Sequence, residues 1–200
     1  MPETVSGDEF FHVTRILPYN NNPPLEIGQQ FEVGNIHNPF FGFYENEIKY
    51  PVNDPNGRIE VKAIKFLSSV KDGTINCPTL PNIAYEIAEH YIMLVRELIM
   101  EEVRTEVAPD APSRKSCLWV VENIDQARHW VGRLGGNSRI ARLSMDGTIH
   151  HADANLMLGD SEPLSRTYAN AHSYWQGEMS DSPEPEVIFS GTTTVAAFED

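Results

Sequence analysis

The stretch PEPEVIFSGTTTVAAF, residues 183–198, combines a strongly β-forming run with two closely spaced carboxylates. The run 187–189 is made of β-branched and aromatic residues, which favour a strand. Glu184 and Glu186 stand at its start, and residues two apart lie on the same face of a strand. The pattern therefore predicts one or two β-segments around Gly191, with both carboxylates directed to one side.

Other parts of the chain also carry strand and turn patterns. Strands are predicted at 9–17, 58–67 and 117–122 from alternating or short apolar runs. A hairpin is predicted over 139–158, because Asp146–Gly147 between two alternating segments is a strong turn signal. A turn is predicted over PVNDPNG, residues 51–57.

Helical patterns fall between these segments. The longest covers 81–107, where apolar positions such as Ile87 and Leu94 recur at helical spacing, and we expect its tyrosines and methionines to lie in the core. A second helix is predicted over 123–136, capped by Asn123 and stopped by Gly135 and Gly136. A short helix is predicted over 163–177. This mixture predicts an α+β fold, a single domain over 1–200 with a helical insertion around 81–107.

Composition narrows the classes of function. A formal charge of −14 opposes non-specific binding to nucleic acid or anionic membranes. No stretch approaches the roughly 18 apolar residues that a membrane span needs. Cys77 and Cys117 are too far apart to indicate a disulfide framework or a zinc site. The N-terminal stretch MPETVSGDEFF has no signal pattern, so we expect a reduced, cytoplasmic protein with no membrane partner.

The charge is unevenly distributed along the chain. Residues 114–142 hold six basic side chains against two acidic ones, Glu122 and Asp125. The basic residues are Arg114, Lys115, Arg128, Arg133, Arg139 and Arg142. This segment is compatible with a surface that faces phosphates, and equally with an ordinary solvated helix and turn.

Three predicted β-segments carry polar or aromatic groups of catalytic type. The first has His12 and Thr14 in an H-x-T pattern, and the second has Trp119 in SCLWVVE, followed by a helix with ARHW. The third has Glu184 and Glu186 in E-x-E-V-I-F. In this order, the motifs resemble the ADP-ribosyltransferase-like fold family, as short matches separated by long unfamiliar stretches. The resemblance implies a split β-sandwich with an inserted long helix, and NAD as co-substrate.

The resemblance also implies roles for single residues. Glu186 would contact the ribose 2′-OH beside the developing oxocarbenium charge, and Glu184 would act as general base toward the acceptor. His12 would hydrogen-bond the adenosine-side ribose, and Thr14 would help to hold NAD. Trp119 would stack on nicotinamide, where the family more often has Tyr or Ser.

Two arginines are further candidates for binding NAD. Arg15 and Arg114 are possible pyrophosphate partners, because guanidinium groups match phosphate oxygens.

The acceptor of ADP-ribose is less defined by these motifs. The H-x-T start is similar to transferases that act on DNA or RNA, and the E-x-E end to transferases that modify protein arginines. We favour nucleic acid over protein as the macromolecular acceptor. Small transferases of this kind resemble toxins of toxin–antitoxin or antiviral defence systems, which implies an antitoxin or chaperone partner.

Two alternatives belong to other classes of protein. His150, His151 and Asp153 in HHAD could serve a metal-dependent hydrolase, with His151 and Asp153 on one strand face. We favour no metal site, because two ligands on one strand are too few. The same strands could also form a non-enzymatic protein-interaction module, which NAD would not stabilise against heat.

Overall fold

The structure is a computed structural model that describes residues 2–15, 23–55, 57–135, 137–157 and 159–199. Its strands are β1 (Glu3–Arg15), β2 (Gln30–Val33), β3 (Lys49–Asp54), β4 (Gly57–Lys62), β5 (Leu118–Val120), β6 (Ser138–Asp153) and β7 (Pro185–Glu199). Its helices are α1 (Pro39–Glu45), α2 (Ala63–Lys71), α3 (Leu80–Val107), α4 (Ile124–Leu134) and α5 (Leu164–Gln176), with a 3₁₀ turn, η1, at Ala154–Leu156. The predicted α+β class is confirmed.

The main sheet is antiparallel and curls until its edges meet. Its strand order is β1-β6-β7-β2, and β5 pairs with the first half of β7. Phe11 of β1 exchanges two backbone hydrogen bonds, of 2.8 and 2.9 Å, with Val121 directly after β5. The sheet therefore forms a closed ring in the order β1, β6, β7 and β5. This ring brings together the three strands that carry the sequence motifs, with His12 on β1, Trp119 on β5 and Glu186 on β7.

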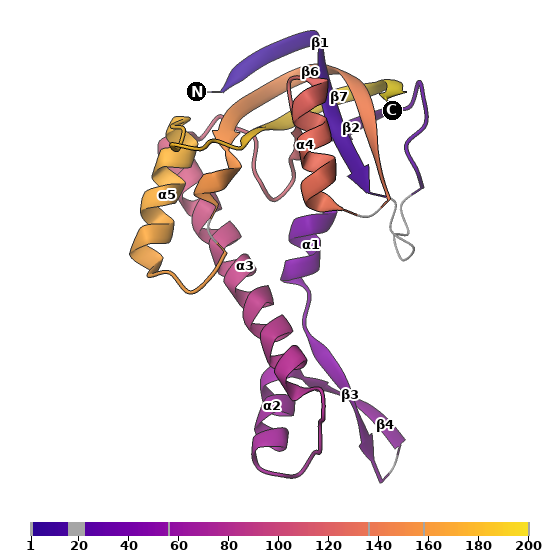
Figure 1. The fold of residues 1–200 in the computed structure, drawn as a ribbon, viewed down its shortest axis with the longest axis vertical. Helices are drawn as coiled ribbons and strands as arrows, with labels where there is room; N and C mark the ends of the chain where they lie inside the picture. Colours follow the sequence, from indigo (N-terminus) through magenta and orange to yellow (C-terminus); the bar gives the residue numbers. More distant parts are fainter. Residues whose placement is uncertain (1, 16–22, 56, 136, 158, 200) are drawn as a thin grey trace.

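The rest of the chain extends away from this sheet. The long helix α3 runs from the sheet to a small lobe formed by α2 and the two-stranded sheet β3–β4 (Figure 1). No helix among the described residues is both long and apolar enough to cross a membrane.

The predicted hairpin at Asp146–Gly147 is wrong. Both residues lie within β6, a single strand that pairs with β1 on one side and β7 on the other. Gly147 faces Gly191 of β7, and a Cβ on Gly147 would lie 2.2 Å from the backbone oxygen of Ser190. The glycine permits close packing of two strands, so its presence does not require a turn.

This close packing gives a testable prediction. Gly147→Ala should lower the free energy of unfolding by about 3 kcal/mol, because the added methyl group forces β6 and β7 apart. Gly132→Ala is the matched control, since a Cβ there meets nothing within 4 Å and alanine favours helix α4 by up to about 1 kcal/mol. Urea unfolding measures both. An unchanged midpoint for Gly147→Ala would contradict the strand contact.

Three other predicted elements have different boundaries. The strand at 9–17 begins earlier, at Glu3, and its residues 16 and 17 lie outside the described part of the chain. The turn at 51–57 is too long, because β3 continues to Asp54. The strand predicted at 58–67 ends at Lys62. Lys62 pairs with Lys49, which is the first residue of β3, so the strand has no partner beyond this point and the chain continues as helix α2.

The three predicted helices are confirmed as α3, α4 and α5. Asn123 caps α4 by accepting from the backbone of Gln126, and Gly135 ends it with φ of 61°. The second predicted stop residue, Gly136, lies outside the described residues. Gly177 ends α5 in the left-handed conformation.

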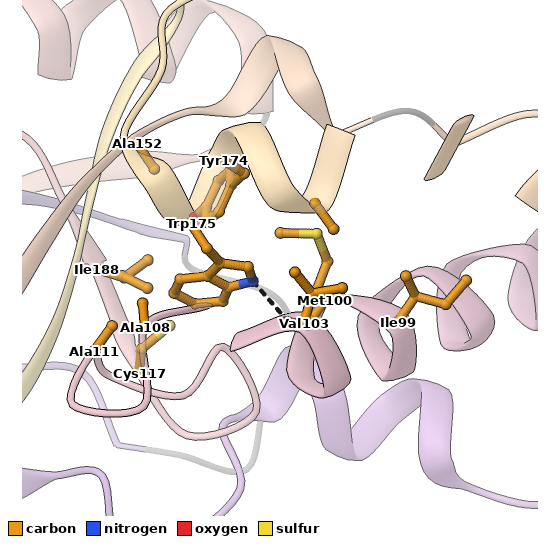
Figure 2. Packing of buried hydrophobic residues seen from close by; sticks show 11 residues of the cluster. Ile99, Met100, Val103, Ala108, Ala111, Cys117, Ala152, Tyr174, Trp175 and Ile188 are labelled. Atoms are coloured by element: carbon orange, nitrogen blue, oxygen red, sulfur yellow. Dashed lines mark hydrogen bonds between the residues drawn. The ribbon is translucent and has the colours of Figure 1, made fainter. Parts of the chain in front are cut away.

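The prediction for the buried side of α3 is confirmed for Met100 and wrong for two tyrosines. Met100 is buried, together with Val103, whereas Tyr85 and Tyr91 are 65% and 45% exposed. Apolar residues occur around most of this helix, so periodicity alone did not select the buried side. In Figure 2, Trp175 of α5 packs into the cluster on α3, and its indole N–H donates to the carbonyl of Met100 at 2.7 Å. This hydrogen bond and the packing around it stabilise the contact between α5 and α3.

Candidate active site

A cavity of about 360 Å³ lies where β1, β5 and β7 meet the helices. Four predicted site residues line it, although they come from distant parts of the chain. These residues are His12, Arg114, Trp119 and Glu186. The closed ring of strands explains this convergence, because β5 pairs with the start of β7 and bridges to β1.

Glu186 is held in one orientation by two buried donors. Its Oε1 accepts a hydrogen bond of 2.6 Å from the Tyr174 hydroxyl and one of 2.8 Å from Arg114 Nη1. Glu186 is only 8% exposed and lines the cavity. Among the described residues, no donor reaches Oε2, so this oxygen is free to accept from a ligand hydroxyl.

Arg114 joins Glu186 to a second buried carboxylate. Arg114 Nε donates to Glu97 Oε2 at 3.0 Å, and Arg96 Nη2 donates to Glu97 Oε1 at 2.8 Å. Two arginines thus balance two glutamates in a buried network around Tyr174. Fully paired charges are the form in which such groups tolerate burial.

The network fixes protonation states. Burial opposes charge on Glu97, but Arg114 and Arg96 outweigh it and lower the pKa of that carboxyl. Burial also opposes charge on Arg114, yet Glu97, Tyr174 and Glu186 together raise its pKa well above the usual value. Burial raises the pKa of Tyr174 well above its ordinary value, with Arg114 opposing the rise and Glu186 adding to it, so the hydroxyl keeps its proton and donates to Glu186.

His12 is held as a neutral imidazole with a defined tautomer. Its Nδ1 lies 2.8 Å from the carbonyl oxygen of Trp119, which can only accept, so Nδ1 carries the proton. Burial lowers the pKa of His12, while the bond to Trp119 raises it by less. The neutral ring therefore has Nε2 as an acceptor on the wall of the cavity.

Trp119 provides an aromatic wall. Its ring meets Phe40 of α1 edge to face, with centroids 5.6 Å apart. The guanidinium carbon of Arg114 lies 5.4 Å from the Trp119 centroid, a cation–π contact. Phe40, together with Trp130 and Met157, extends the apolar part of the cavity.

The remaining predicted residues lie elsewhere. Thr14 and Arg15, near the described end of β1, are not among the residues that line the cavity, and Arg15 is exposed. Glu184 is also outside the lining, but it forms an ion pair with Arg133, a lining residue of α4. Glu184 and Glu186 thus pair with different partners, Arg133 and Arg114 respectively.

Three residues of the site were not predicted to take part in it. Tyr174 and Glu97 hold Glu186 and Arg114, and Arg96 adds a cation to the lining beside Arg133 of the predicted basic segment. Glu97 and Arg96 carried a signal, since these two charged residues interrupt the otherwise apolar run 92–100 of the helix. Tyr174 carried none that distinguishes it from an ordinary core tyrosine, because only the fold brings α5 to β7.

The residues of the alternative metal site have other partners. Asp153 is fully buried, and its carboxylate accepts from the backbone N–H groups of Asn155, Ser180 and Glu184. His150 packs against Trp175, with ring centroids 5.3 Å apart. No group of three or more His, Cys, Asp or Glu side chains suited to a metal occurs among the described residues. Asp153 therefore has a structural role as an acceptor for three backbone amides.

Comparison with known proteins places the chain in a family but assigns it no activity. No curated protein matches the chain. A family model described as "Protein of unknown function (DUF2441)" matches residues 10–200, which include the cavity, the buried network, strands β5, β6 and β7, and residues 10–15 of β1. The chain therefore belongs to the DUF2441 family.

Proposed function

We propose that this protein is an NAD-consuming ADP-ribosyltransferase with an ADP-ribosyltransferase-like split β-sandwich. The observation that carries the proposal is the convergence of His12, Trp119 and Glu186 on one cavity. The resemblance of the sequence motifs to that family selected these residues, and all three line the same cavity because the closed ring of strands brings them together.

The lining has the donors and acceptors that NAD requires. A volume of about 360 Å³ falls in the usual range for small-ligand sites. His12 Nε2 and Glu186 Oε2 can accept from ribose hydroxyls, and Trp119 can stack on nicotinamide. Arg133 lines the cavity and suits a diphosphate, whereas Arg114 and Arg96 are engaged by buried carboxylates and suit a positioning role.

The chemistry follows from the placement of Glu186. The bond between the ribose C1′ and the nicotinamide nitrogen breaks, and its electron pair leaves with nicotinamide. The ionised Glu186 stabilises the positive charge that develops on the ribose more than it stabilises the ground state. A nucleophile of the acceptor then forms a bond to C1′, and Glu184 takes its proton.

For the acceptor we propose a macromolecule, with nucleic acid favoured over protein. The basic segment 114–142 supplies exposed cations beside the site, Arg128 and Arg133 on α4 among them. Arg142, in the same segment, lies on β6 and pairs with both Glu9 and Glu199. A phosphate contact would therefore centre on α4.

The test is release of nicotinamide from NAD, with and without cell lysate. We expect release that lysate accelerates, and transfer of label from adenylate-labelled NAD to material of high molecular weight. Digestion with nuclease or protease then identifies the acceptor. Absence of release by the correctly folded protein under every condition would refute the proposal.

Replacement of His12 tests NAD binding. His12→Ala should raise the KM for NAD by about tenfold and change kcat less, because one hydrogen bond to the bound ribose is lost. His151→Ala is a matched control, since His151 lies outside the cavity lining and contacts surface carboxylates. A tenfold effect in both variants would contradict a specific role for His12.

The same histidine predicts a pH dependence. Burial lowers the pKa of His12 from 6.5, so the ring stays neutral at pH 7 and gains a proton only in more acidic solution. The KM for NAD should be constant above pH 6.5 and rise below it, because protonation removes the Nε2 acceptor. His12→Ala should lack this rise, and steady-state kinetics from pH 5 to 8 measure it.

A further inference from the structure

A second cavity, of about 430 Å³, lies between α1, the start of β3 and the first half of α3. Its lining shares no residue with the first cavity. Aromatic rings form much of the wall, with Phe43 and Tyr44 from α1 and Tyr50 from β3. We call it the lower cavity.

His90 of α3 is a buried polar group in this wall. It is 7% exposed, and its ring lies among aromatic rings, 5.3 Å from the centroid of Tyr44 and 5.7 Å from that of Phe43. Within the described part of the chain, its ring nitrogens have no hydrogen bond or ion pair, and they are not fully buried atoms, so they stay accessible at the cavity wall. A ligand in the cavity that donates a hydrogen bond can therefore bind one of them.

The charge of the lining is negative. It holds the carboxylates Glu47, Glu86 and Glu89 against a single lysine, Lys49. Lys49 and Lys62 both pair with Glu47. Glu86 and Glu89 therefore lack a basic partner among the described residues, and they face the cavity beside the aromatic rings.

The pKa values of two tyrosines in the lining, Tyr44 and Tyr50, are affected by this negative charge. Burial raises the pKa of Tyr50, and the carboxylate of Glu86 raises it further. Burial likewise raises the pKa of Tyr44, with an added effect of Glu89. Each carboxylate thus acts on a phenol that lines the same cavity.

We propose that the lower cavity binds an organic cation that carries an alkylammonium or guanidinium group. Ring faces of Phe43 and Tyr44 attract such a cation, and Glu86 and Glu89 supply its counter-charges. Its N–H groups can donate to the unpartnered nitrogen of His90. The cation is either a free polyamine or a basic side chain of a bound polypeptide, since both present the same chemistry.

The experiment is calorimetric titration of the full-length protein with agmatine, spermidine and a short arginine-containing peptide. We expect saturable binding that weakens with salt, and a shift of the His90 ring resonances in NMR spectra. Glu86→Gln/Glu89→Gln and His90→Phe should each weaken binding by about tenfold or more. Glu106→Gln, at an exposed position of the same helix, is the matched control and should change nothing.

The comparison of the three titrated ligands distinguishes the source of the cation. Tighter binding of agmatine or spermidine than of the peptide assigns the site to a free amine, and the reverse order assigns it to a polypeptide. Absence of binding by all three, or equal loss in the Glu106→Gln control, would overturn the proposal. None of these outcomes depends on NAD turnover, because the two cavities have separate linings.

Discussion

Glu186→Gln is expected to reduce nicotinamide release from NAD by about 100-fold or more, as is typical for loss of one group that stabilises a developing charge. Glutamine has the same shape and can still accept from Tyr174 and Arg114 through its carbonyl oxygen. The KM for NAD should change little, because the lost charge acts mainly in the transition state. Release of nicotinamide measured under saturating NAD gives the ratio of kcat values.

Two controls make this result specific. Glu184→Gln should impair transfer to the acceptor more than nicotinamide release, because Glu184 is proposed to act on the nucleophile. Glu184 lies outside the cavity lining and pairs with Arg133, which belongs to the lining. Near-ultraviolet circular dichroism verifies that both variants are folded. If Glu186→Gln retains a third or more of the wild-type rate, Glu186 is not the catalytic carboxylate.

The cavity could be predicted from the sequence in part, for a physical reason. His12, Trp119 and Glu186 each lie on or next to a β-forming segment, and strands from distant parts of a chain meet when they share one sheet. Local patterns thus identified the strands and their polar residues. The bridge between Phe11 and Val121 that closes the ring had no local signal, because it depends on how the whole sheet curls.

Other features depended on contacts that no short window contains. Asp146–Gly147 has the composition of a hairpin turn, but partners on both sides keep it extended, and tertiary pairing overrides the local preference. Tyr174 and Glu97 lie in separate helices, and only the packing of α5 and α3 around β7 directs them to Glu186 and Arg114. The local helix patterns predicted where α3 and α5 lie, but not which side chains enter the site.

The buried network predicts the largest effect on stability. Arg114→Met should lower the free energy of unfolding by about 3–5 kcal/mol, because it leaves Glu186 and one oxygen of Glu97 without their cation in a buried site. Arg128→Met is the matched control, since this exposed arginine pairs with Asp125 at the surface, and its loss should cost less than about 0.5 kcal/mol. Urea unfolding at pH 7 measures both changes.

A double variant separates the unpaired charge from lost packing. Arg114→Met/Glu186→Gln should be more stable than Arg114→Met alone by about 1–2 kcal/mol, because the second substitution removes a buried carboxylate that no longer has a cation. Packing defects alone would instead add, and the double variant would then be the less stable of the two. Additive losses would therefore contradict the ion pair between Arg114 and Glu186, and with it the role of Arg114 in holding the carboxylate toward the cavity.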